Sequence, residues 1–412
     1  MKVAGIIAEY NPFHNGHKFH MEQVKEITGA DYLIVVMSGD FTQRGTPTIL
    51  NKYARAQMAL TCGADLVLEI PAYFASGSAE FFAEGAVSLL DQLGVVDAIC
   101  FGSECGDIEK LTRIADILAF EPDEYQVALK YQLKSGFTYP VARNNALELT
   151  IPGFNEYSEI LGSPNNILGI EYVKSILRQK SKIIPHTNIR VGSGYHDRKI
   201  SGASFSSAIS IRQSVALQDS MELIRDQVPE PVFDILMENH GKGFPVFSND
   251  FSCQLKYKLF MEQNTGFEKF MDVTPELSDR ICNTLFEMKD FDSFCERLKT
   301  KDITYARVSR CLNHILLDMK KEDMELFRSE NSVYYARVLG LNQASSPLMK
   351  AIHEEGTIPL ISKASTARNI LSENGMIQFN KDVQVANVYE SVVSKKFNCE
   401  MVSELSRPVC KI

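Results

Sequence analysis

The first 210 or so residues alternate short apolar segments of β type with longer segments of helical periodicity. This alternation predicts a parallel sheet covered by helices on both faces, because parallel strands are connected by crossover helices. Ligands bind such sheets beyond the carboxyl ends of the strands, so the loops there are candidate sites. The predicted strands are Val3–Ala8, Tyr32–Met37, Leu66–Ile70, Ala98–Phe101 and Ile183–Val191. The predicted helices are His17–Thr28, Asn51–Cys62, Ala79–Leu93, Ile108–Phe120 and Asn165–Gln179.

The pattern becomes mainly helical from about Met221 onward. The total length of 412 residues exceeds what one hydrophobic core usually serves. We therefore expect an α/β parallel-sheet domain over residues 1–218 and a mostly helical domain over residues 219–412, with a C-terminal tail. The helical segments are Met221–Glu238, Cys253–Glu262, Pro275–Glu287, Phe291–Leu298, Tyr305–Met319 and Ser346–Glu354, and the strand candidates are Val333–Leu339 and Thr357–Ile361.

Composition excludes some classes of protein. The net charge of −9 argues against a surface coated with basic residues, although one basic face could still bind a structured RNA. Nine cysteines without a CxxC pair indicate free thiols in a reducing cytosol, and they make a zinc site improbable. The apolar run at the N-terminus is too short for a signal peptide or a membrane span, so we expect a cytoplasmic protein.

The loop after the first predicted strand reads Asn-Pro-Phe-His-Asn-Gly-His, over residues 11–17. It leads into a helix, and the N–H groups at a helix start attract phosphate. Gly16 has no Cβ and would let a phosphate approach the backbone closely. His14 and His17 could donate hydrogen bonds to oxygens that gain charge when an α-phosphate is attacked. The alternative is a strand–turn–helix unit with two incidental histidines.

This heptapeptide resembles the HxGH signature of the nucleotidyltransferase superfamily, which has a Rossmann-like fold and transfers AMP or CMP. Ser204–Arg212 resembles the late motif of the superfamily, in which serine hydroxyls, a helix N-terminus and an arginine bind the outgoing phosphates. Ala208 stands where that motif usually has threonine. The resemblance implies that His14 and His17 are catalytic, and that ATP is bound by Ile7, Asn11, Phe13, His14, Gly16, His17, His20, Gly102, Asn165, Arg190, Ser206, Ser207 and Arg212.

Three of these residues also have ordinary structural interpretations. Gly102 follows a predicted strand and could be a plain turn glycine. Asn165 lies where a helix begins and could be a capping residue. Arg190 could be a solvated charge at a strand end.

Several segments together resemble the bacterial tRNA(Met) cytidine acetate ligases over most of the chain: residues 8–17, 37–45, 162–169, 304–310 and 337–340. The resemblance implies that acetate attacks the α-phosphate of ATP, giving acetyl-adenylate and pyrophosphate. The acetyl group then passes to N4 of the wobble cytidine of elongator tRNA(Met). The implied partners are ATP, acetate and this tRNA, with Mg²⁺ accompanying ATP. We expect no dedicated metal ligands, organic cofactor, membrane or DNA partner.

Ser38, Asp40 and Arg44 follow the second strand and are candidates for an acetate-binding loop. Asp40 would repel acetate unless it bound a metal or oriented a donor, and Arg44 could be an exposed loop charge. The candidates for tRNA contacts are Lys174, Arg178, Lys180, Lys182, Arg198 and Lys199, in a basic run that includes Arg190, together with Tyr305, Arg307 and Arg310 on a predicted helix. Charge runs of this kind are more often solvated faces.

Two other functions remain open at this stage. The same HxGH chemistry would serve an adenylyltransferase that acts on a small phosphorylated cofactor precursor. A degenerate nucleotidyltransferase domain could instead sense ATP within an RNA-binding protein. The intact histidine pair and late serine motif argue against this last alternative.

Overall fold

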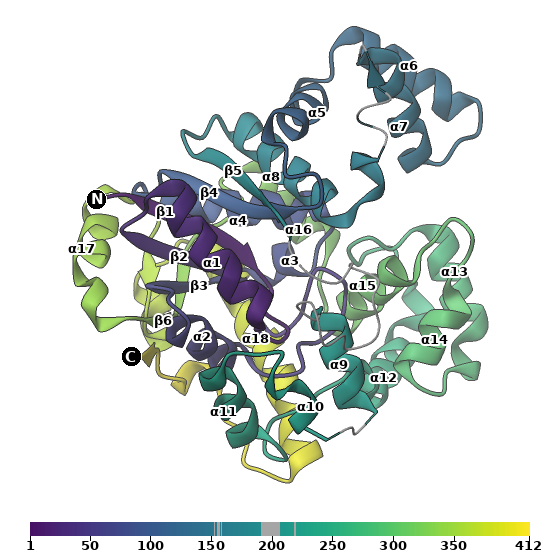
Figure 1. Ribbon diagram of the computed structural model, residues 1–412. Coiled ribbons are helices and arrows are strands. Elements are labelled where there is room, and N and C mark those ends of the chain that lie inside the picture. Colours follow the sequence, from purple (N-terminus) through teal and green to yellow (C-terminus); the bar gives the residue numbers. More distant parts are fainter. Residues whose placement is uncertain (152, 155–156, 158, 191–206, 218–219) are drawn as a thin grey trace.

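The structure is a computed structural model that describes residues 1–151, 153–154, 157, 159–190, 207–217 and 220–412. Five strands form the parallel part of an eight-stranded sheet, in the order β5-β4-β1-β2-β3 (Figure 1). They are β1 (Val3–Ala8), β2 (Tyr32–Ser38), β3 (Leu66–Ile70), β4 (Ala98–Ser103) and β5 (Ile184–Ile189). The chain starts at the centre, builds outward to β3 and then crosses back to β4, so the strand order switches between β1 and β4. This architecture confirms the predicted α/β class.

Helices cover both faces of the parallel strands. Side chains of β2 alternate: Leu33, Val35 and Met37 pack with α1 and α2, whereas Ile34 and Val36 pack on the opposite face with α4, α5 and α8. Side chains of the preceding residue cap the starts of several helices, as Asn51 does for α2. The bounds are α1 (Asn15–Thr28), α2 (Lys52–Thr61), α3 (Ala72–Ala75), α4 (Ala79–Gln92), α5 (Ile108–Phe120) and α8 (Pro164–Gln179).

The C-terminal half is mostly helical, as predicted, but it also completes the sheet. Strand β6 (Ala336–Leu341) pairs antiparallel with β3, and β7 (Leu360–Ile361) and β8 (Cys410–Lys411) pair with β6. β6 thus covers the edge of β3, which would otherwise present unpaired backbone groups. The boundary at residues 218/219 stays a prediction, but residues 219–412 are not a unit separate from the sheet. Helix α9 (Ala208–Ala216) precedes this half, whose helices are α10 (Glu222–Arg225), α11 (Glu230–Asn239), α12 (Ser252–Glu262), α13 (Pro275–Thr284), α14 (Phe291–Leu298), α15 (Tyr305–Leu316), α16 (Lys321–Ser329), α17 (Ser346–Glu355) and α18 (Glu373–Phe397).

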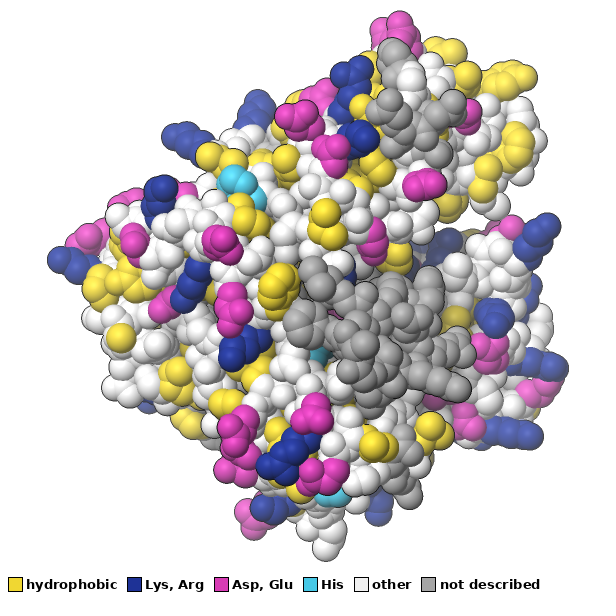
Figure 2. All heavy atoms as spheres, in the orientation of Figure 1, with side chains coloured by type: hydrophobic (Ala, Val, Ile, Leu, Met, Phe, Trp, Pro, Cys, Tyr) yellow, Lys and Arg dark blue, Asp and Glu magenta, His cyan; other side chains and the backbone are white. Residues whose placement is uncertain are grey.

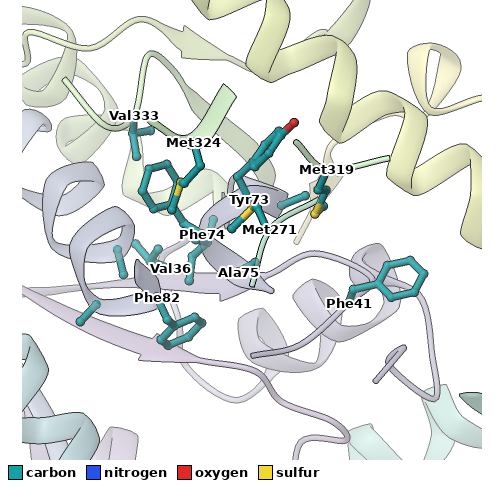
Figure 3. Close-up of a cluster of buried hydrophobic side chains, with 14 of the residues drawn as sticks. Val36, Phe41, Tyr73, Phe74, Ala75, Phe82, Met271, Met319, Met324 and Val333 are labelled. Atoms are coloured by element: carbon teal, nitrogen blue, oxygen red, sulfur yellow. The ribbon is translucent and has the colours of Figure 1, made fainter. Parts of the chain in front are cut away.

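One hydrophobic cluster joins the two halves of the chain. Met271, Met319 and Met324 from the helical region gather around the side chains of α3, including Tyr73 and Phe74 (Figure 3). All five are buried, and they belong to the same cluster as the β2 residues on that face of the sheet. The helical region is therefore fixed against the sheet by a shared core.

Two predictions of helices were wrong or incomplete. The single helix expected over Met221–Glu238 is divided into α10 and α11, because Pro229 restricts the backbone of the residue before it. Helices α6 (Asp123–Lys134) and α7 (Tyr139–Thr150) were not predicted and project from the body of the molecule (Figure 1). No helix in the described part of the chain is both long enough and apolar enough to span a membrane.

Candidate active site

A cavity of about 400 Å³ lies at the carboxyl ends of β1, β4 and β5, where the strand order switches. The starts of α1, α8 and α9 and the loop after β2 also contribute to its wall. This is the place where open α/β sheets bind ligands. It brings together eleven of the predicted ATP-binding residues: Ile7, Asn11, His14, Gly16, His17, His20, Gly102, Asn165, Arg190, Ser207 and Arg212. Phe13 does not line it, because its ring is buried in the core beneath the loop, and Ser206 lies outside the described residues.

His14 and His17 stack on each other at the start of α1, with ring centroids 3.6 Å apart and planes inclined by 25°. The Nδ1 atom of His14 accepts the backbone N–H of Gly16 at 3.1 Å. The Nδ1 atom of His17 accepts the backbone N–H of His14 at 3.2 Å. A nitrogen that accepts a hydrogen bond carries no proton, so each neutral ring has its proton on Nε2 and can donate from that atom.

Both rings are neutral at physiological pH. Burial, together with the cations of Arg190 and Arg212, lowers the pKa of His14 to about 3. The pKa of His17 lies well below its ordinary value, because of burial and the neighbouring His14. Each ring therefore offers a neutral Nε2–H donor at this pH.

The expectation that free N–H groups of α1 hold a phosphate is wrong for this structure. Asn15 N–H donates to the carbonyl of Gln227 at 3.0 Å, Gly16 N–H to His14 Nδ1, and His17 N–H to the carbonyl of His14 at 2.9 Å. His14 at the N-cap position accepts two of these N–H groups and the carbonyl of Gln227 accepts the third, so none of the three is left for a phosphate. At this helix the imidazoles are the available donors.

The start of α9 also faces the cavity, through Ser207, Ala208 and Ile209. Ser207 caps the helix by accepting Ser210 N–H at 3.2 Å. The partial positive charge of a helix N-terminus favours an anion here. Ser207 and Arg212 of the late motif therefore lie at the same cavity as the histidines, at a sequence distance of about 190 residues.

Guanidinium groups dominate the charge of the cavity wall. Arg44, Arg190 and Arg212 line it, against the carboxylates of Glu9 and Glu104. Arg212 donates to the carbonyl of Asn11 at 2.6 Å, and burial lowers its pKa only to about 10, so it stays charged. The net positive charge suits a polyphosphate.

Glu104 is occupied at the start of α8. Its carboxylate accepts Asn166 N–H at 2.8 Å and the side-chain amide of Asn165 at 2.6 Å. Asn165 in turn accepts from Arg190 at 3.1 Å. Asn165 thus joins the start of α8 to Arg190, so neither residue is merely a helix cap or a solvated strand end.

The structure separates the three candidates for the acetate loop. Arg44 lines the cavity, whereas Ser38 and Asp40 are buried behind it. Asp40 accepts Lys52 N–H at 2.8 Å, and burial raises its pKa to about 6. Asp40 therefore holds the start of α2, which gives this residue a structural role.

Most of the described tRNA candidates are paired within the protein. Lys174 is buried and bridges Glu171 at 2.7 Å and Glu80 at 3.4 Å, so its prediction as an RNA contact is wrong. Lys180 and Lys182 are exposed, whereas Arg198 and Lys199 lie outside the described residues. Basic and acidic side chains are interspersed on the described surface in Figure 2. Three of the remaining candidates contact acidic residues: Arg178 with Glu80 and Glu121, Tyr305 with Asp292, and Arg310 with Asp272. The fourth, Arg307, is partly exposed.

Sequence reasoning missed several residues of the cavity wall. Two of them had a usable signal, since Glu9 directly follows β1 and Glu104 directly follows β4, at strand ends that face the site. The apolar residues carry no such signal, because a cavity wall and a core have the same composition. The missed residues include Glu9, Tyr10, Phe19, Gln43, Phe82, Phe101, Glu104, Leu168, Tyr172 and Asn188.

The fold and the paired histidines at its switch point define a nucleotidyltransferase. The profile of the HIGH Nucleotidyl Transferase family matches residues 1–404, and the chain belongs to this family.

More specific relatives cover nearly the whole chain. It is 42% identical to the tRNA(Met) cytidine acetate ligase of Acetivibrio thermocellus over 89% of each chain, and 36% identical to that of Thermosipho melanesiensis over 99% of each. The crystal structure of Thermotoga maritima TmcAL (apo, form I) aligns with a TM-score of 0.92 at 34% identity, over 100% of both chains. TmcAL bound with alpha-thio ATP (form II) gives a TM-score of 0.90 at the same identity and coverage.

Proposed function

We propose that this chain is an ATP-dependent ligase that activates acetate as acetyl-adenylate and acetylates N4 of the wobble cytidine of elongator tRNA(Met). The observation that carries the proposal is the neutral His14–His17 pair beside three guanidiniums in one cavity. The likeness to acetate ligases along almost the full chain supports the choice of substrates.

In the first step, a carboxylate oxygen of acetate attacks the α-phosphorus of ATP. A new P–O bond forms, the bond to the bridging oxygen of pyrophosphate breaks, and pyrophosphate leaves. Charge accumulates on the α-phosphate oxygens during this step, and the Nε2–H groups of His14 and His17 stabilise it. Arg212 and the start of α9 bind the departing pyrophosphate, and Arg190 contributes charge from the end of β5.

In the second step, N4 of cytidine attacks the acetyl carbon and AMP leaves. The N4 lone pair is delocalised into the ring, so this weak nucleophile needs the mixed anhydride as an activated acyl donor. N4 loses one proton as the amide forms. A wobble base lies in a single-stranded loop and can leave its stack at modest cost. Since tRNA is modified in the cytoplasm, the proposed function places the protein there.

We expect Mg²⁺ to enter with ATP and offset the charge of the pyrophosphate. In the described part of the chain, no three His, Cys, Asp or Glu side chains form a group that could hold a metal ion. We infer that phosphate oxygens and water supply most of the ligands of this ion.

The proposal is tested by incubating the protein with ATP, isotopically labelled acetate and unmodified tRNA(Met), followed by mass spectrometry of the nucleosides. Labelled N4-acetylcytidine is the expected product. ATP–pyrophosphate exchange should depend on acetate and should not respond to nicotinate mononucleotide or phosphopantetheine. Exchange driven by either precursor without acetate would favour the cofactor-making alternative. An absence of both exchange and product would contradict the proposal.

A further inference from the structure

The loop that carries Arg44 to the cavity is held by a helix from the other half of the chain. The turn over residues 42–46 closes through Gly45 N–H to the carbonyl of Thr42 at 2.9 Å and Thr42 N–H to the carbonyl of Thr46 at 3.0 Å. Gln43 and Arg44, at the tip, line the cavity.

Two side chains of α15 converge on one carbonyl of this turn. Ser309 donates its hydroxyl to the Gly45 oxygen at 2.5 Å, and the Asn313 amide donates to the same oxygen. Both side chains are buried, with exposed fractions of 0% and 1%. A carbonyl has two lone pairs, so these two donors satisfy it completely.

The backbones of the turn and α15 lie in close contact at Gly45. Gly45 has φ +72°, and a Cβ atom at this position would overlap the backbone of Ser309 and Arg310. The helix is also held from behind, because the buried His314 ring lies with its two nitrogens 3.0 and 2.9 Å from the carbonyl oxygens of Met271 and Ser76 and donates to one of them. α15 is thus a fixed support for the turn.

The other side of the same turn is attached to the cavity wall. Gln43 N–H donates to Glu9 at 2.9 Å, and Glu9 directly follows β1. The Arg55 guanidinium, from α2, donates to the carbonyls of Glu9, Ser38 and Gly39. Arg44 therefore stands on a turn clamped between the sheet and α15, next to the carbonyl that α15 holds.

We propose that Ser309 and Asn313 are positioning residues for the adenylation step, which act through the Gly45 carbonyl to place the Arg44 guanidinium in the cavity. This inference rests on the proposed function. It makes the efficiency of the adenylation step depend partly on α15, a helix outside the ATP-binding segments. Loss of the two donors frees the turn, and Arg44 then samples positions away from the anionic substrates.

The test is a double-mutant cycle on acetate-dependent ATP–pyrophosphate exchange with the full-length protein. We expect Ser309→Ala together with Asn313→Ala to lower kcat/KM about tenfold or more, as expected for two hydrogen bonds. In an Arg44→Ala background the same pair of substitutions should change kcat/KM less than about twofold. Ser278→Ala is the matched control, because the Ser278 hydroxyl is also buried and accepts Phe267 N–H at a distance of 3.0 Å, but it does not contact the turn. This substitution should leave exchange unchanged.

Melting temperatures are measured for all variants, and Ser309→Cys replaces the double variant if that variant does not fold. An equal loss in both backgrounds, or no loss in the wild-type background, would overturn the inference. Failure of the proposed function is distinguishable, because the unmodified protein would then show no acetate-dependent exchange at all.

Discussion

His17 Nδ1 accepts the backbone N–H of His14, and the two rings stack at 3.6 Å. The hydrogen bond fixes the start of α1 and the tautomer of His17, and the stacking fixes the relative placement of the two imidazoles. The residues that would stabilise a pentacoordinate phosphorus are therefore set before any substrate binds, which is the arrangement that electrostatic stabilisation requires.

The low pKa of His14 predicts a pH-dependent contribution to stability. Below pH 6.5 the unfolded chain protonates this histidine, whereas the folded chain does so only near pH 3, so the free energy of unfolding decreases as pH falls through this window. His14→Asn keeps a favourable N-cap residue and removes this titration. As the pH falls from 6.5 to 5, the unfolding free energy of the wild type should decrease by up to about 2 kcal/mol relative to that of the variant. Urea titrations at several pH values measure it, and a constant difference would contradict the assignment.

A buried ion cluster fixes α2 to the sheet and to the C-terminal segment. Lys52 lies 2.8 Å from Glu69 and 3.0 Å from Glu404, with all three side chains nearly inaccessible. Lys52→Met removes the cation between the two buried carboxylates, although Arg337 still lies 3.7 Å from Glu404, and should cost about 3–5 kcal/mol at pH 8. Lys350→Met breaks an exposed pair with Glu354 and should cost less than about 1 kcal/mol. Equal costs in denaturant unfolding would show that the cluster is not desolvated.

Gly45 and Gly136 give a matched pair for the turn that carries Arg44. Both have positive φ, but a Cβ at Gly136 meets no atom within 4 Å, whereas one at Gly45 meets α15. We expect Gly136→Ala to cost about 1 kcal/mol from backbone strain alone. Gly45→Ala should cost clearly more and should also lower acetate-dependent exchange. If thermal and denaturant unfolding gave the two variants the same stability, the close contact between turn and helix would be refuted.

The positions of two lysines predict different effects on tRNA binding. Lys182 is exposed, and if it contacts a phosphate, Lys182→Gln should weaken binding and reduce the slope of log K against log salt by about one. Lys174 is buried in ion pairs with Glu80 and Glu171, so Lys174→Gln should lower stability and leave the salt slope unchanged. Fluorescence titrations between 50 and 300 mM salt, roughly the range where such slopes are linear, measure both. If only the Lys174 variant changed the slope of log K against log salt, Lys174 and not Lys182 would be the lysine that contacts tRNA phosphate.

Local patterns in the sequence were sufficient to predict the parallel half of the fold. The range Val3–Ala8 was predicted residue for residue, because a buried parallel strand is a continuous apolar run that ends at a turn. The HxGH and late serine motifs contain six of the eleven predicted residues that the cavity brings together, and the other five came from the family resemblance.

The remaining features depend on contacts between distant residues. The pairing of β6 with β3 joins segments about 270 residues apart, and no local periodicity encodes it. Lys52 and Arg55 are of residue types that are usually exposed, yet both are buried, because their partners come from the sheet, the loops and the C-terminal segment. For the same reason Asp40 was placed near the substrate when it holds the start of α2.

The central claim is that neutral imidazoles of His14 and His17 stabilise the α-phosphate during adenylation. The most direct measurement is acetate-dependent ATP–pyrophosphate exchange by His14→Asn and His17→Gln, which keep suitable residues at the N-cap and third positions of α1. We predict a decrease in kcat of about 10²–10³-fold for each variant, with the KM for ATP changed little and the melting temperature maintained. Exchange at the wild-type rate by either folded variant would contradict it.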